Sequence, residues 1–157
     1  MGTDWRDDRV ASAADGTNPT VLMHLDGGYA VIGDVQFLPG YCVLLTDVPG
    51  TDRLTDLPRA RRVAFLSSME LLSEAVEIVC GRRDAAFRRM NLEIQGNELP
   101  LLHAHLWPRY DWEPEDLVHG AVGGYPVTSW SNIDHRLGAR HDQLRSELCS
   151  ELNRLVL

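Results

Sequence analysis

The alternation of hydrophobic and polar positions predicts three short strands in the first third of the chain. Residues 20–25 form a β-prone run that ends at Asp26-Gly27-Gly28, which predicts a hairpin turn into a second strand over 29–35. Residues 41–45 are a continuous apolar run, typical of a central buried strand. The preceding residues 1–19 are polar and show no period, so we expect a flexible N-terminal tail.

One long helix is expected next, from Pro58 to about Cys80. Proline suits the first turn of a helix, where its missing N–H leaves no bond unmade, and Gly81 is the expected stop. Apolar residues recur at steps of three and four, and a second set widens the stripe: Phe65, Met69, Leu72, Val76 and Val79, with Val63, Leu66, Ala75 and Ile78. One side of one sheet cannot cover this much apolar surface. We therefore expect the helix to contact a second copy of the chain as well, in a homodimer.

Two further strands are predicted, at residues 86–95 and 101–107, with a short hairpin loop between them. Strand side chains alternate between faces, so the second of these strands presents two histidines on one face. The loop length sets the register of the pair. The expected cross-strand pairs are Gln95 with Leu101, Glu93 with His103, and Asn91 with His105.

The last part of the chain lacks a clear period until its end. Residues 111–140 are rich in Gly, Pro, Trp and His, and a final helix is predicted from His141 to Leu155, with one leucine stripe. No repeat, low-complexity tract or linker interrupts the chain. We therefore expect a flexible tail over 1–19, one domain over 20–113, and a C-terminal extension with a terminal helix over 114–157.

Composition and charge narrow the classes of partner. The formal net charge is −8, and such an acidic chain repels nucleic-acid backbones, so no nucleic-acid partner is expected. Two arginine pairs, at 82–83 and 88–89, are either solvated or able to meet one small phosphate ligand. No apolar run is long enough to span a membrane, and the acidic N-terminus is not a signal peptide. We expect a cytoplasmic protein without a membrane partner.

The cysteines indicate neither a disulfide framework nor a zinc site. Cys42, Cys80 and Cys149 are widely spaced and odd in number, and no Cys-x-x-Cys pair occurs. We expect free thiols without a functional role, in a reducing compartment.

His103 and His105 are the candidate functional residues, and three interpretations of them are open. The first is a solvated sheet face with incidental histidines. The second is a metal site, because imidazole suits zinc, iron and copper. However, the sugar-binding β-barrels that use His-x-His have a Glu three or four residues later, and here the next is Glu113. The third is nucleophilic catalysis, in which one imidazole attacks phosphorus while the other hydrogen-bonds nearby. We expect no metal and no cofactor.

Residues 96–110 favour the third interpretation. Their sequence, Gly-Asn-Glu-Leu-Pro-Leu-Leu-His-Ala-His-Leu-Trp-Pro-Arg-Tyr, resembles the signature of the histidine-triad (HIT) family, in which three histidines alternate with apolar residues before Pro-Arg. It is most similar to bacterial members described as diadenosine-tetraphosphate hydrolases. Leu101 stands in the place of the first histidine. Residues 34–45 resemble the family's Asp, Pro-Gly loop and buried strand, and the likeness covers about residues 20–113.

The resemblance implies a fold and a set of roles. The fold is α+β, with a five-stranded antiparallel sheet, one long helix and a C-terminal helix, usually in a dimer. His103 is expected to attack the α-phosphorus and form a nucleotidyl-histidine, while His105 hydrogen-bonds the phosphate. Asp34 is expected to hold ribose hydroxyls. The nucleotide-binding residues that the resemblance implies are Asp34, Asn91, Gly96 and Asn97.

Two functions follow from this likeness. One is a nucleotide phosphohydrolase or nucleotidyl transferase acting on a phosphate ester or phosphoanhydride, such as a dinucleoside polyphosphate. The other is a catalytically weak nucleotide-binding module. The intact pair of His103 and His105 favours the enzyme. Leu101 favours the binding module, as does the Thr46-Asp47 pair where the family often has Lys-His.

Overall fold

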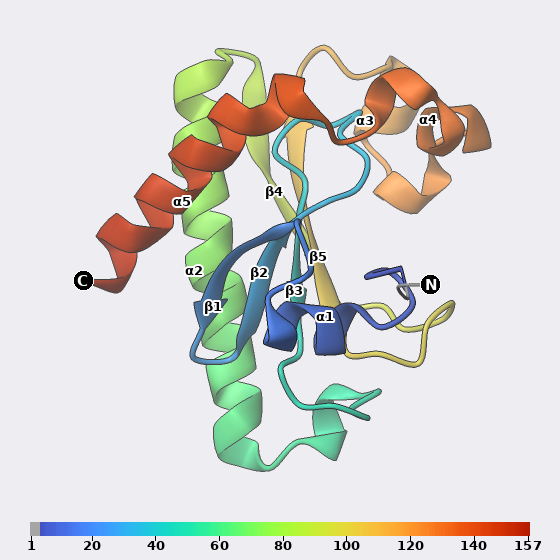
Figure 1. Ribbon diagram of the computed structural model, residues 1–157. Helices are drawn as coiled ribbons and strands as arrows, with labels where there is room; N and C mark the ends of the chain where they lie inside the picture. The colour runs from blue at the N-terminus through green and yellow to red at the C-terminus, as the bar shows by residue number, and fades with distance from the viewer. Residues whose placement is uncertain (1–3) are drawn as a thin grey trace.

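The protein folds around a single five-stranded antiparallel sheet, described here from a computed structural model that covers residues 4–157 (Figure 1). The strand order is β1-β2-β3-β5-β4, so the first three strands form a meander and β5 lies between β3 and β4. The strands are β1 Val21–Leu25, β2 Gly28–Ile32, β3 Cys42–Leu45, β4 Phe87–Glu93 and β5 His103–Tyr110. The α+β prediction with a five-stranded antiparallel sheet is confirmed.

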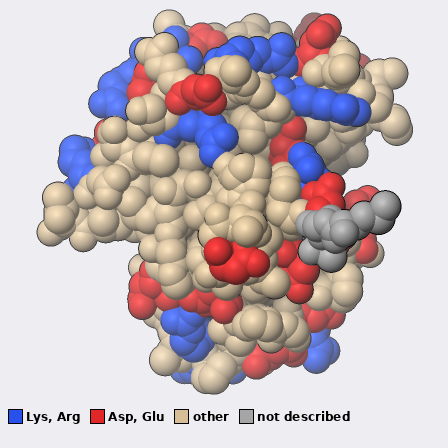
Figure 2. All heavy atoms as spheres, in the orientation of Figure 1, with Lys and Arg blue, Asp and Glu red and all other residues tan. Residues whose placement is uncertain are grey.

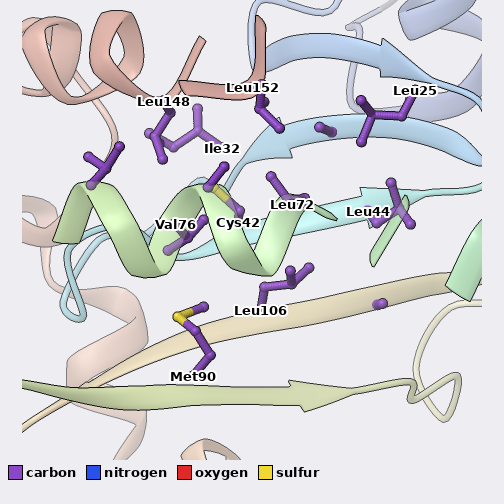
Figure 3. Packing of buried hydrophobic residues seen from close by; sticks show 14 of the residues in the cluster. Leu25, Ile32, Cys42, Leu44, Leu72, Val76, Met90, Leu106, Leu148 and Leu152 are labelled. Atoms are coloured by element: carbon purple, nitrogen blue, oxygen red, sulfur yellow. The ribbon is translucent and has the colours of Figure 1, made fainter. Parts of the chain in front are cut away.

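Two long helices cover one face of this sheet. They are α2 (Arg59–Arg83) and α5 (Asp142–Val156), and they pack against each other as well as on the strands (Figure 1). Figure 3 shows leucines of α5 and apolar side chains of α2 meeting strand residues in one buried cluster. The second apolar side of α2, which we expected a partner subunit to cover, is thus covered in part by α5 of the same chain. Outward-facing positions farther along α2 are polar: Ser67, Glu70, Glu74 and Glu77.

The predicted end of α2 at Gly81 is wrong, because the helix continues to Arg83. A glycine inside an exposed helix costs only about 1 kcal/mol, and here the last turn gains partners on α5. Arg82 pairs with Glu151 at 3.0 Å and Arg83 with Glu147 at 2.9 Å. This arginine pair therefore joins two helices. On the face in Figure 2, arginines are most numerous at the top of the view, where α2 ends.

The opposite face of the sheet carries the histidines, and short elements cover it. Helix α1 (Arg9–Asp15) lies here, with Val10 and Ala13 buried, and Gly16 ends it at a φ of +80°. The prediction of a flexible tail is therefore wrong for these residues, and residues 1–3 lie outside the described part of the chain. Further cover comes from α4 Val127–Ser131 and the 3-10 turn Val122–Gly124, whose Trp130 and Val122 pack in this face's apolar cluster. The other short elements are α3 Glu115–Val118 and the 3-10 turns Leu54–Asp56, Ile133–His135 and Ala139–His141.

The predicted register of β4 and β5 is wrong by two residues. Glu93 pairs with His105 and Asn91 with Trp107. The cause is Leu102, whose N–H donates to Thr51 O at 2.9 Å instead of joining the hairpin. The connection between the strands therefore spans 94–102. A shift of two preserves the face of every side chain, so Asn91 and Glu93 remain on the histidine face.

Among residues 4–157, no helix combines the length and the apolar character needed to cross a membrane.

Candidate active site

Strand β5 presents His103 and His105 on the face opposite to α2. Between them, Ala104 points into the main core and is fully buried. His103 lies beside Leu45 of β3, and His105 beside Val43. The two imidazoles are in contact, with 3.1 Å between their Nε2 atoms. The predicted sharing of one face therefore holds in the structure.

A chain of three hydrogen bonds determines which nitrogen carries each proton. His103 Nδ1 lies 2.6 Å from Leu101 O, and a carbonyl oxygen only accepts, so Nδ1 carries the proton. The Nε2 of a neutral His103 is then an acceptor, and His105 Nε2–H donates to it. That leaves His105 Nδ1 as the acceptor of the Tyr41 hydroxyl, at 2.7 Å. The chain therefore leaves a lone pair on His103 Nε2.

Burial supports the states assigned to His105 and Tyr41. Burial, and secondarily repulsion from His103 when that ring is protonated, lowers the pKa of His105 to about 4, so this ring is neutral at pH 7. Burial, and then the charge of Asp34, raises the pKa of Tyr41 above its ordinary value and keeps its hydroxyl as a donor. Tyr41 is stacked on Trp107, with 3.5 Å between ring centroids. The donor to His105 is thus held by an aromatic neighbour.

A cavity of about 190 Å³ opens at the two histidines. Its wall includes Tyr41, and Trp130 of α4 closes it from the side of the C-terminal segment. Two charged side chains also line it, Arg9 of α1 and Asp34 after β2. Two imidazoles and a cation in one small cavity can act on a phosphate group.

Comparisons with known proteins agree on the fold. No family model matches the chain, and no curated protein matches it. Among solved structures, a histidine triad protein from Marinobacter aquaeolei VT8 is 22% identical with a TM-score of 0.67, over 86% of this chain and 89% of that one. One from Sinorhizobium meliloti 1021 is 14% identical with a TM-score of 0.70, over 96% of each chain. A zinc-bound histidine triad family protein from Mycobacterium smegmatis is 14% identical with a TM-score of 0.60, over 94% of each.

The chain has the histidine-triad fold. At the position where the sequence resemblance places the first histidine, the backbone carbonyl of Leu101 accepts a hydrogen bond from His103 and holds that ring in place.

The residues that the histidine-triad resemblance implied are only partly brought together. Asp34 lines the histidine cavity, but its carboxylate is already bound by Arg9. Asn91 is half-buried on the same sheet face, beside Trp107 and outside the cavity wall. Gly96 and Asn97 are exposed in the 94–102 connection and do not line the cavity either.

Sequence analysis missed the cation and the hydroxyl donor of the cavity, Arg9 and Tyr41. Arg9 lies in the segment that we expected to be a flexible tail. A signal was present there, because Asp8 is a favoured helix cap and Gly16 a favoured stop. Tyr41 was interpreted only as part of a buried strand. Its hydroxyl reaches His105 across the sheet, which strand periodicity does not reveal.

The arginine that closes the histidine-triad signature has a structural role here. The side chains of Arg109 and Glu113 are 3% and 0% exposed and form a bidentate pair, with 2.8 Å between Nη2 and Oε2. Arg109 also donates to the carbonyls of Leu117 and Gly120. The pair therefore fixes the start of the C-terminal segment to β5.

A larger cleft, of about 820 Å³, lies beside the histidine cavity and shares Asp34 and Val35 with it. Among the described residues, its wall contains no histidine or cysteine, so it offers no imidazole or thiol nucleophile for phosphorus. In the described part of the chain, no three His, Cys, Asp or Glu side chains are grouped to hold a metal ion.

The buried His105 should make stability depend on pH. Its pKa is lowered from 6.5 to about 4 in the folded protein, so the unfolded chain binds a proton more tightly. This contribution is fully present above pH 6.5 and is lost as the pH falls toward 4, by up to about 3 kcal/mol. Urea unfolding across this range should show that His105→Gln removes this part of the pH dependence. His119→Gln, at an exposed position, is the control, and an unchanged slope in His105→Gln would contradict the assignment.

Proposed function

We propose that the protein is a nucleotide phosphohydrolase or nucleotidyl transferase that works through a covalent intermediate on His103. The observation that carries the proposal is the hydrogen bond from His103 Nδ1 to Leu101 O, which keeps the proton on Nδ1 and leaves the lone pair on Nε2 of a ring that lines the cavity. A neutral imidazole with a directed lone pair is a competent nucleophile at pH 7.

The reaction has two displacements at phosphorus. The Nε2 lone pair of His103 forms a bond to phosphorus, and the bond from phosphorus to the leaving oxygen breaks with its electron pair on that oxygen. Water then attacks the same phosphorus, the phosphorus–nitrogen bond breaks, and its pair returns to Nε2. The proton lost by water goes to solvent. In a transferase, another hydroxyl takes the place of water.

His105 supplies a donor that becomes available only during the reaction. Before attack, its Nε2–H is bound to the lone pair of His103. Once that lone pair is used to bond phosphorus, the N–H is free to donate to a phosphate oxygen. An interaction gained during the reaction lowers the barrier, whereas one already present in the bound substrate does not.

The substrate class that we propose is a phosphate ester or phosphoanhydride such as a dinucleoside polyphosphate. Asn91, Gly96 and Asn97 remain candidates for nucleotide contacts, and Asp34 becomes one only if a ligand displaces Arg9 from its carboxylate. Leu101 supports the second candidate, a nucleotide-binding module with weak catalysis, because its side chain cannot make the hydrogen bonds of an imidazole. The two candidates differ in turnover rather than in binding.

A ligand screen followed by a turnover assay tests the proposal. A ligand at 100 times its dissociation constant should stabilise the protein by about 2.7 kcal/mol. Each stabilising nucleotide is then assayed for a released monophosphate. Stabilisation with turnover supports the enzyme, and stabilisation without turnover supports the binding module. If no nucleotide or phosphate ester stabilises the protein, both are wrong.

We also propose a homodimer, through the edge strand β4 and the first turns of α2. In the described part of the chain β4 is an edge strand, and Leu92 within it and Ile94 after it are 42% and 40% exposed. Val63 and Leu66 of α2 add exposed apolar surface.

Sedimentation should show a mass of about twice 17.6 kDa. Leu92→Glu should give monomers, whereas Val127→Glu, at another exposed apolar position, should not. A wild-type monomer at micromolar concentration would refute this.

A further inference from the structure

Arg9 and Asp34 form an ion pair inside the wall of the histidine cavity. Arg9 Nη2 lies 2.5 Å from Asp34 Oδ2, and Nη1 lies 3.3 Å from Oδ1, so the guanidinium donates hydrogen bonds to both oxygens. Arg6 Nε lies 3.9 Å from the same carboxylate. The two oxygens that a ribose diol would need are therefore already bound by a side chain of the protein.

We propose that Arg9 is the phosphate-binding group of the histidine cavity and that Asp34 is its positioning residue. The ligand would then be recognised by its phosphate rather than by its ribose, which makes small phosphate esters and anhydrides the substrate class. This inference rests on the proposed function and deepens it.

Charge at the cavity supports this role. Arg9 is the only cation in the described wall, and Asp34 the only carboxylate. His105 is neutral, because burial lowers its pKa to about 4. A phosphate that gains negative charge needs a fixed positive donor, and here only Arg9 provides one. A guanidinium has five N–H donors and Asp34 takes two, so the others are available to a ligand.

The volume of the histidine cavity also favours recognition of the phosphate rather than of the nucleoside. Its volume of about 190 Å³ lies below the range of about 300–1,000 Å³ that is usual for small-molecule sites. A phosphate with a short substituent fits such a space. A nucleotide would be held by its phosphate, with its nucleoside outside this cavity.

The packing of α1 fixes the position of Arg9. Asp8 caps the helix by accepting from Ala11 N at 2.9 Å, and Val10 is buried next to Arg9. The guanidinium of Arg9 also lies 5.0 Å from the centre of the Trp5 ring. A guanidinium held on both sides is ordered before a ligand arrives, which reduces the entropy lost on binding.

Calorimetric titration of the full chain with inorganic phosphate, AMP and adenosine tests the proposal. We expect phosphate and AMP to compete for one site and adenosine not to bind. Arg9→Gln should weaken both phosphate and AMP by about ten- to hundred-fold. Arg59→Gln is the matched control, since Arg59 is also the first residue of a helix and is exposed. Asp34→Asn keeps an acceptor for Arg9 and should not weaken AMP.

The opposite model, in which Asp34 binds ribose and Arg9 only blocks it, predicts opposite signs. Arg9→Gln would then tighten AMP, and Asp34→Asn would weaken AMP without affecting phosphate. Adenosine binding as tightly as AMP would equally overturn the proposal.

Two further variants separate direct contact from indirect effects. Arg9→Gln combined with Asp34→Asn should bind phosphate as weakly as Arg9→Gln alone. Recovery of wild-type affinity in the double variant would mean that Arg9 only neutralises Asp34, and would refute the proposal. If Arg9→Gln fails to fold, Arg9→Lys keeps the charge without the fork and should lose affinity several-fold, whereas unchanged affinity would count against Arg9. These titrations need no turnover, so their outcome is independent of whether His103 forms an adduct.

Discussion

Replacing His103 with alanine should lower kcat by about 10⁴-fold or more on whichever phosphate substrate the protein turns over. The reason is that His103 Nε2 carries the lone pair that attacks phosphorus, whereas Nε2 of His105 carries a proton and its Nδ1 accepts from Tyr41. His105→Gln keeps a donor near Nε2 and should lose only about 10²–10³-fold. Steady-state kinetics on purified variants would measure both values.

The control for this series is His119→Ala, which removes an imidazole from an exposed position and should leave kcat unchanged. Thermal melts of each variant ensure that a lost rate reflects chemistry rather than unfolding. Wild-type turnover in His103→Ala would remove His103 from the mechanism. A larger loss in His105→Gln than in His103→Ala would exchange the two roles.

The second large effect is on stability, through the buried pair of Arg109 and Glu113. Glu113→Ala leaves a buried guanidinium without its counter-charge, and such a change costs about 3–5 kcal/mol. It also removes the acceptor of the Tyr110 N–H, at 2.7 Å, and of the Tyr125 hydroxyl. For a chain of this size, the melting temperature should fall by roughly 10 °C.

Glu147→Ala is the comparison for this variant, because its ion pair with Arg83 lies at the surface and should contribute less than about 1 kcal/mol. Denaturant unfolding of both variants would give the two free energies. Equal losses would show that the Arg109–Glu113 pair does not anchor the C-terminal segment. We expect hydrogen exchange over residues 117–125 to rise in Glu113→Ala, since Arg109 binds carbonyls in that segment.

Local pattern predicted the parts of the fold that depend on local sequence. The period of α2 and the apolar run of β3 identified both elements, because a buried stripe or strand must be apolar whatever surrounds it. Helix α1 was missed, since an isolated helix of its length is not stable and this one depends on burying Val10 and Ala13. The register of β4 was missed because Leu102 bonds Thr51, a partner far away in sequence.

In the candidate site too, the sequence predicted the features that depend on local pattern and missed those that depend on distant contacts. Strand alternation placed His103 and His105 together on one face, since the period of a strand leaves no other choice. Arg9 reaches the cavity from α1 and Tyr41 from the residue before β3, both distant from β5 in sequence, so no spacing could reveal them. The ion pair of Asp34 could not be predicted either, because its partner Arg9 lies in a segment whose structure depends on the rest of the fold.

Mass spectrometry of enzyme quenched at alkaline pH during turnover tests the central claim most directly. The tryptic peptide from Met90 to Arg109 contains His103 and His105 and no other histidine, so fragmentation can assign the modified ring. We predict an acid-labile phosphorus–nitrogen adduct on His103, absent from His103→Ala, and discharge in heavy-oxygen water that labels the released monophosphate. Turnover at an undiminished rate with no adduct, or with an adduct on His105, would contradict the account.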